Sequence, residues 1–222
     1  LTARAKRTHK NIYASIRDAM KKNDEPKMPS TRRLGVESSK SRHALLDAAE
    51  LIMREEGYAA VTSRHVANKA ALKPQLVYYY FRTMDDLFLA LYRRRAEQGL
   101  AHLQKVLAAP APLHALWKLF CEPTNGALNA EFMALANHRK IIGDEIARQG
   151  EQVRAMQAEV LTRVLRERGI AAEKYPPVVI AMLLATLSQV LIRERALGIE
   201  SGHAELTAII DRFLDQLEPP TS

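Results

Sequence analysis

Residues 42–92 read RHALLDAAELIMREEGYAAVTSRHVANKAALKPQLVYYYFRTMDDLFLALY. Apolar residues recur in this stretch at helical spacing, and strand-like alternation is sustained nowhere in the chain. A first helix is predicted to follow the capping residues Ser38 and Ser39 and to end at Gly57. Its apolar face is predicted to consist of Leu45, Ala48, Ala49 and Ile52.

Three further helices are predicted from the residues that begin them. Thr62 or Ser63 caps a short second helix. A third helix opens at Lys73-Pro74 and ends at Phe81, because proline is tolerated in a first helical turn. Thr83, with two aspartates behind it, caps a longer fourth helix. Three short helices followed by a longer one predict a compact helical unit.

This stretch resembles the DNA-binding domain of the TetR family over its whole length. The resemblance implies an all-α fold, with an N-terminal three-helix helix-turn-helix DNA-binding domain and a C-terminal helical ligand-binding and dimerisation domain. Two positions depart from the family pattern: Ala71 stands where the turn usually has glycine, and Met84 replaces a lysine that commonly contacts phosphate. The matching positions are Ala48-Ala49, Glu56-Gly57-Tyr58, Thr62, Val66-Ala67, Ala70-Ala71-Leu72, Val77-Tyr78-Tyr79-Tyr80-Phe81 and Asp86-Leu87.

The resemblance also implies a function. We expect a sequence-specific transcriptional regulator, in the usual case a repressor, that binds a double-stranded palindromic operator as a homodimer and is released by a small-molecule effector. A carrier protein that has kept the fold and lost operator recognition is the alternative, supported only by Ala71 and Met84. The sequence has no nucleophile elbow, phosphate-binding glycine loop or dinucleotide fingerprint, so we expect no enzymatic activity and no cofactor.

The third helix is the expected reader of DNA. A helix in the major groove packs its inner face on the domain and exposes polar side chains from its first turns. Leu72, Val77 and Phe81 suit the inner face. Lys73, Gln75 and Tyr79 would then point toward DNA, where Gln75 can pair with an adenine edge and Lys73 can reach guanine or phosphate.

Contacts to the DNA backbone are expected around the start of the second helix. Thr62 and Ser63 place hydroxyl groups and free backbone N–H groups where a phosphate is well accommodated, although capping alone also explains both residues. Tyr78 resembles the family tyrosine that contacts phosphate. Arg64, Tyr80 and Arg82 are further candidates, and at least one ring of the tyrosine triplet is expected to pack in the core.

The second half is predicted to contain helices at about 113–120, 124–137, 139–168, 177–197 and 203–217. Residues 178–192 are apolar on nearly every face, and a helix of this kind has to be covered on most sides. We expect a subunit interface at the C-terminal helices, with burial inside one subunit as the alternative. The candidate interface residues are Leu187, Leu191, Leu206, Ile210, Phe213 and Leu214.

An effector is expected among the central helices of this half. Large apolar side chains could line such a cavity, although residues of this kind more often form ordinary core. The candidates are Trp117, Phe120, Phe132, Met133, Met156 and Met182. His102, His114, His138 and Cys121 lack close metal-ligand spacing, so no metal site is expected.

We expect three parts: a basic N-terminal arm, residues 1–37, and, as the resemblance implies, a helix-turn-helix domain, residues 38–93, and an effector and dimerisation domain, residues 94–222. Residues 1–40 hold 11 Lys or Arg against 4 Asp or Glu, whereas residues 94–222 hold 15 of each. Such an arm suits nucleic acid or an anionic membrane surface, and a solvated tail is the alternative. A single cysteine, no secretory signal and no apolar run of about 20 residues predict a cytoplasmic protein without a membrane partner.

Overall fold

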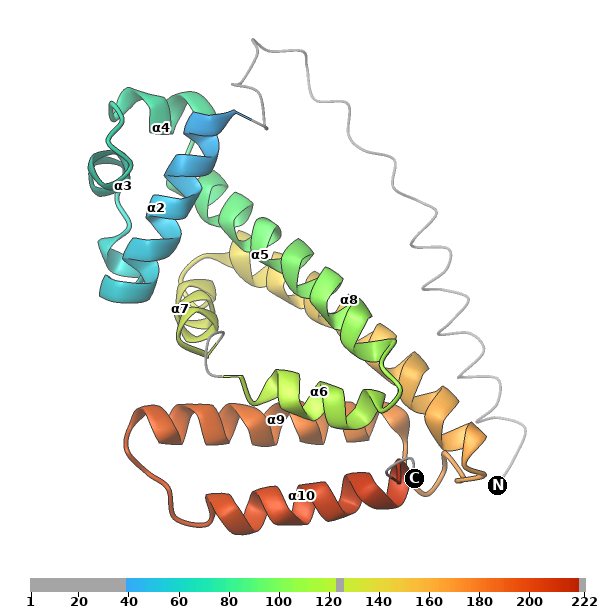
Figure 1. Cartoon of the computed structure of the whole chain (residues 1–222). Coiled ribbons are helices and arrows are strands. Elements are labelled where there is room, and N and C mark those ends of the chain that lie inside the picture. The colour runs from blue at the N-terminus through green and yellow to red at the C-terminus, as the bar shows by residue number, and fades with distance from the viewer. Residues whose placement is uncertain (1–38, 123–125, 220–222) are drawn as a thin grey trace, which may run out of the picture. The chain divides into compact units, whose positions relative to one another are not determined.

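The computed structural model describes residues 39–122 and 126–219, and within these ranges it contains helices and no strand (Figure 1). The all-α fold class is therefore confirmed. The basic arm and Ser38 lie outside the described residues. The elements are α2 (Lys40–Glu56), η1 (Tyr58–Ala60), α3 (Ser63–Lys69), α4 (Gln75–Tyr80), α5 (Met84–Leu107), α6 (Pro112–Phe120), α7 (Gly126–Ala136), α8 (Lys140–Glu167), α9 (Pro177–Ala196) and α10 (His203–Leu217).

Side-chain caps set the starts of the first helices as the sequence predicts. The Ser39 hydroxyl accepts a hydrogen bond from the backbone N–H of Arg42, and Thr62 caps α3 by accepting from the N–H of His65. At α5 the Thr83 hydroxyl accepts from the N–H of Asp86, whose carboxylate accepts from the N–H of Thr83. This reciprocal capping box satisfies donors that would otherwise have no partner at the helix start.

A single apolar core joins the first helices to the middle of the chain. Its buried side chains come from α2, α3, α4 and α5, and also from α7 and the start of α8, including Phe132 and Ile142. Residue 93, the predicted boundary between domains, lies inside α5, and the described residues all belong to one compact unit. The two functional halves therefore share a helix and a core.

A second apolar core lies among α6, α8, α9 and α10. Figure 1 shows α5 and α8 running alongside each other, and α8 also packs against α9. By length and composition α9 could cross a membrane, but Ile180, Leu184 and Leu191 on one of its faces are buried in this core. Its other face is uncovered: Val179 and Leu183 are exposed.

Candidate DNA interface and ligand cavity

The turn between α3 and α4 has the hydrogen bonds of a Schellman motif. The N–H of Leu72 donates to the carbonyl of Ala67 at 2.9 Å, and the N–H of Ala71 donates to the carbonyl of Asn68 at 3.1 Å. Ala71 adopts a φ of +54°, which is the left-handed conformation that this motif requires and that favours glycine. The family's usual turn is thus built here with alanine, which adopts the required conformation at a steric cost.

Helix α4 has the two faces that DNA reading requires. Val77 and Phe81 are buried, and Leu72 packs against the same core, so the predicted inner face is observed. The residues predicted to face DNA are all exposed: Lys73 and Gln75 at the start of α4, and Tyr79 in its last turn. Arg64 and Arg82 are exposed beside them.

The structure brings two of the predicted phosphate-binding residues together. The Tyr78 hydroxyl donates a hydrogen bond to the Ser63 hydroxyl at 3.1 Å, and Tyr78 is 55% exposed. Tyr80 is the ring that packs against the core, with Tyr79 in an edge-on contact at a centroid distance of 4.9 Å. Met84, the departure at the start of α5, also packs against the core. It therefore contributes burial where the family's lysine contributes charge.

Residues 45–91 match the family described as "Bacterial regulatory proteins, tetR family". The chain therefore carries a DNA-binding domain of the TetR type. The match covers the capped helices, the α3–α4 turn and the exposed face of α4 that are described above.

A curated protein is also similar to part of the chain. The HTH-type transcriptional regulator HbdR of Aromatoleum sp. (strain CIB) is 29% identical over 113 residues, which cover 46% of this chain and 47% of that protein. The match therefore spans about half the length of this curated relative.

Two solved structures share the fold over a longer range. A TetR transcription regulator from Haloarcula marismortui is 19% identical, with a TM-score of 0.65 over 80% of this chain and 97% of that one. Salmonella enterica GusR is 16% identical, with a TM-score of 0.65 over 85% of this chain and 100% of that one. The TetR fold therefore extends through the second half of the chain, where sequence similarity is low.

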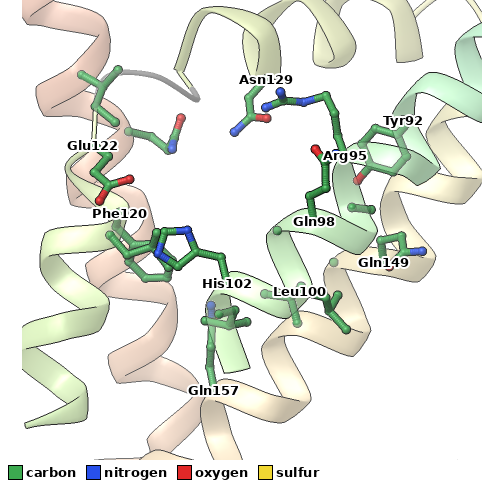
Figure 2. A pocket seen from close by; sticks show the side chains of 18 residues that line it. Tyr92, Arg95, Gln98, Leu100, His102, Phe120, Glu122, Asn129, Gln149 and Gln157 are labelled. Carbon is green, nitrogen blue, oxygen red and sulfur yellow. The ribbon is translucent and has the colours of Figure 1, made fainter. Parts of the chain in front are cut away.

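A cavity of about 450 Å³ lies among the central helices of the chain. Its wall is formed by α5, α6, α7, α8 and α9, and Figure 2 shows side chains from several of these helices converging on it. The wall is rich in carboxamides and also carries one guanidinium, one imidazole and one phenol. The polar lining residues are Tyr92, Arg95, Gln98, His102, Glu122, Asn129, Gln149, Gln157 and Gln189.

Of the six residues predicted to line a cavity, one does so: Phe120. Trp117 and Phe132 are buried in the two apolar cores, and Met156 packs beneath the cavity wall against Leu103 and its neighbours. Met133 and Met182 are exposed on the surface. Large apolar side chains such as Trp117 and Phe132 thus mark the packed cores, and the cavity is lined by both polar and apolar side chains.

Two glycines in the middle of helices lie beside this cavity. Gly99 of α5 and Gly150 of α8 both line it, and an added Cβ atom at either position would meet no atom within 4 Å. Glycine inside a helix costs about 0.5–1 kcal/mol relative to alanine. Both glycines are exposed, so the space beside them is open and a side chain would project into it.

The cavity wall is tied to the DNA-binding helices through Glu50 of α2. Arg94 donates to this carboxylate at 2.9 Å, and Arg95, which lines the cavity, donates to it at 3.2 Å. Arg94 also donates to Asp47 at 2.6 Å. A second tie runs from α7, where the Glu131 carboxylate accepts a hydrogen bond from the backbone N–H of Tyr58 at 2.7 Å.

Glu145 of α8 is a buried carboxylate below the same wall. Arg148 donates to it at 2.6 Å and Arg93 at 3.1 Å, and Gln149 of the cavity wall also donates to it. Burial raises the pKa of Glu145, but the hydrogen bonds from Arg148, Arg93 and Gln149 outweigh burial and lower its pKa to about 2. Burial, together with the charge of Glu145, raises the pKa of the Tyr92 phenol, so this cavity residue is a hydrogen-bond donor.

The predicted interface residues divide into two groups. Leu191, Ile210 and Leu214 are buried in the subunit's own core, and Leu187, Leu206 and Phe213 are partly buried against it. The exposed apolar side chains of α9 and α10 are Val178, Val179, Met182, Leu183 and Ile209. Between residues 39 and 219, outside the undescribed gap, no group of three His, Cys, Asp or Glu side chains is placed to hold a metal ion.

Proposed function

We propose that this chain is a cytoplasmic transcriptional regulator of the TetR family that binds a palindromic operator as a homodimer and is released from it by a small-molecule effector. The observation that carries the proposal is the outward face of α4, where Lys73, Gln75 and Tyr79 are exposed above a buried inner face. Gln75 would pair with an adenine edge and Lys73 with guanine or a phosphate.

The backbone contacts of the proposed complex lie beside this face. The hydrogen-bonded pair of Tyr78 and Ser63 would bind one phosphate together, and Arg64 would lie beside them. Tyr80 packs inward and is the weakest of the proposed contacts. Arg82 follows α4 and remains exposed, so it adds a charge that can reach the DNA backbone.

Dimerisation is proposed through the uncovered face of α9. Val179 and Leu183 of this face are exposed although the helix is apolar by composition. An exposed apolar patch of this kind marks a site of association. A twofold axis beside α9 and α10 would cover both copies of the patch and would place two recognition helices on one side of the dimer.

Release of the operator is assigned to the cavity among α5 to α9. An effector changes operator affinity only as far as it prefers one arrangement of the protein over another. The contacts of Arg95 and of Glu131 with the DNA-binding helices give the cavity wall a direct mechanical link to them. The proposal therefore requires that occupancy of the cavity alter these contacts.

Selection of genomic fragments by the purified protein tests the proposal, at an ionic strength of about 150 mM. We expect enrichment of one palindrome that is bound at least roughly a thousandfold more tightly than a scrambled duplex. Tyr79→Ala should change which sequences are selected, whereas Arg82→Ala should weaken binding to all of them alike. Equal, salt-sensitive binding to every duplex would reject a sequence-specific regulator.

A further inference from the structure

Gln157 presents a polar group to the cavity that the protein itself does not pair. Its side chain is only 5% exposed and lines the cavity, and among the described residues its carboxamide has no hydrogen-bond partner. Figure 2 shows Gln157 extending from α8 toward His102 at the cavity wall. The carboxamide of Gln157 is not among the buried atoms that lack a partner, so it reaches the open space of the cavity. It is therefore available to a molecule that enters the cavity and forms hydrogen bonds.

Arg95 belongs both to the cavity and to the link with the DNA-binding helices. It lines the cavity with a side chain that is 16% exposed, and it donates to the Glu50 carboxylate of α2 at 3.2 Å. A guanidinium has five N–H donors in a planar fork. The group can therefore bind an anion that enters the cavity, and the anion would compete with Glu50 for the same donors.

We propose that the cavity binds a small organic carboxylate whose carboxylate group pairs with Arg95 in competition with Glu50. The inference rests on the proposed function, because it takes the cavity to be the effector site. Arginine pairs with a carboxylate through two parallel hydrogen bonds, which makes it a selective partner for this group.

Charge fixes the orientation of the bound molecule. Figure 2 shows Arg95 and Asn129 at one side of the cavity, with Glu122 and Phe120 at the other. Glu122 repels an anion, so the carboxylate lies at the Arg95 side and the body of the molecule extends toward Phe120. A hydroxyl or amide on this body would meet Gln157. The apolar wall along the body consists of Leu100, Leu103, Leu119, Phe120, Val153 and Ile192.

The competition gives the ligand a way to act on the DNA-binding helices. Glu50 keeps its bonds to Arg94 at 2.9 Å and Arg54 at 3.0 Å when Arg95 turns to the ligand. The attachment of α2 to α5 is then weaker but not lost. Because coupling between two binding events is reciprocal, any change that frees Arg95 from Glu50 has to strengthen ligand binding.

The first experiment compares three molecules of one size on the full chain by isothermal titration calorimetry: 3-phenylpropionate, 3-phenylpropionamide and 3-phenylpropanol. We expect the carboxylate to bind at least about tenfold more tightly than the other two, as a charge-assisted hydrogen bond predicts. Arg95→Gln should abolish this preference while the alcohol binds as before. Equal affinity for all three molecules, or no binding of the carboxylate, overturns the proposal.

The second experiment tests the competition itself. Glu50→Gln should raise the affinity for 3-phenylpropionate about fivefold or more, because the hydrogen bond between Arg95 and residue 50 then loses its charge and competes less with the ligand. Asp47→Asn is the matched control, since Asp47 pairs with Arg94 and not with Arg95 in the described structure. If Glu50→Gln does not fold, Glu50→Asp should give a smaller gain. Equal effects at Asp47 and Glu50, or no effect at Glu50, overturn the competition.

Neither experiment includes DNA, so its failure can be told apart from failure of the proposed function. If the protein prefers the carboxylate but selects no operator, the proposed ligand site stands and the proposed regulatory function is rejected. A chain that selects an operator but shows no preference among the three molecules would remain a regulator whose effector is of another class.

Discussion

The DNA-binding end of the molecule, α2 to α4, and its other end, α8 to α10, place polar and apolar side chains in opposite ways. Among α2, α3 and α4 every buried side chain is apolar, as Leu45, Ile52 and Val77 illustrate. From α8 onward the interior also holds charged and polar groups, and the surface holds most of the large exposed apolar residues. The buried polar residues are Glu145, Gln157, Ser188, His203 and Glu218.

The difference shows which binding partners the side chains at each end require. At the DNA-binding helices, water satisfies the exposed polar side chains, and DNA is the only further partner that this face needs. The other end has groups that its own chain leaves without a partner: the Gln157 carboxamide at the cavity, and the exposed side chains of Val179 and Leu183. A protein whose interior is partly polar and whose surface is partly apolar depends on other molecules for its lowest free energy.

The largest effect is expected where the two ends share a core. Phe132 of α7 is 2% exposed in the core of the DNA-binding helices, and its neighbour Met133 is 57% exposed. Phe132→Ala should lower the free energy of unfolding by about 3–5 kcal/mol, because it leaves a cavity. Met133→Ala, the control, should change it by less than about 0.5 kcal/mol. Urea unfolding measures both, and similar losses would show that α7 is not part of this core.

The next effect concerns the exposed apolar face. Leu183→Glu would place a charge in the proposed dimer interface and should raise the dimer dissociation constant at least about a hundredfold. Leu51→Glu is the control, since Leu51 is an exposed leucine on α2 of the DNA-binding end. Sedimentation equilibrium distinguishes the two variants. If the Leu183 variant dimerises as tightly as the wild type, the dimer interface does not include this face of α9.

The buried carboxylate predicts how stability depends on pH. The pKa of Glu145 is lowered to about 2, so its contribution is present above pH 4.5, its ordinary value, and is lost as the pH falls toward 2. Since Arg93 and Arg148 are half exposed and screened by water, we discount the contribution to about 2 kcal/mol. Glu145→Gln should therefore lose this stability at pH 7 and approach the wild type near pH 2.

Thermal melts from pH 7 to pH 2 give the measurement, with Glu151→Gln on the exposed side of α8 as the control. A difference between Glu145→Gln and the wild type that stays constant over this range would contradict the ion-pair explanation.

The smallest effect is expected at the DNA-binding end itself. Ala71 has a φ of +54° in the α3–α4 turn, where an L-residue pays a steric cost that glycine avoids. Ala71→Gly should raise the free energy of unfolding by about 0.5 kcal/mol after the loss of chain entropy is included. Ala70→Gly, one residue earlier at a φ of −81°, should lower it instead. Gains at both positions would mean that the turn is not strained.

The sequence predicts the DNA-binding end well because its determinants are local. Caps such as Ser39, Thr62 and Thr83 lie within three residues of the N–H groups that they accept from. The left-handed turn at Ala71 is also set by its neighbours. The helices of the second half are predicted for the same reason, since apolar spacing is a property of each helix alone.

The cavity is predicted poorly because its determinants are not local. Trp117 and Phe132 are apolar and large, which selects them for packed core whether or not a cavity is nearby. Arg95 and Gln157 become wall residues only because the packing of α5 against α8 brings both to the same cavity. The glycines at 99 and 150 also line the cavity, but a glycine in a helix does not show which helices enclose an open space.

Helix α5 connects the cavity to the DNA-binding helices, and its length determines how far a tilt at the cavity displaces those helices. It has 24 residues, with Met84 beside the DNA-binding core and Gln98 at the cavity. At a rise of 1.5 Å per residue, these two positions lie about 21 Å apart. A tilt of about 5° at Gln98 would therefore displace the Met84 end by about 2 Å. In the proposed dimer the two displacements together exceed the rise of one base pair, about 3.4 Å. A small rearrangement at the cavity, of the size of one side chain, would then change the distance between the two recognition helices by about one base pair along the DNA.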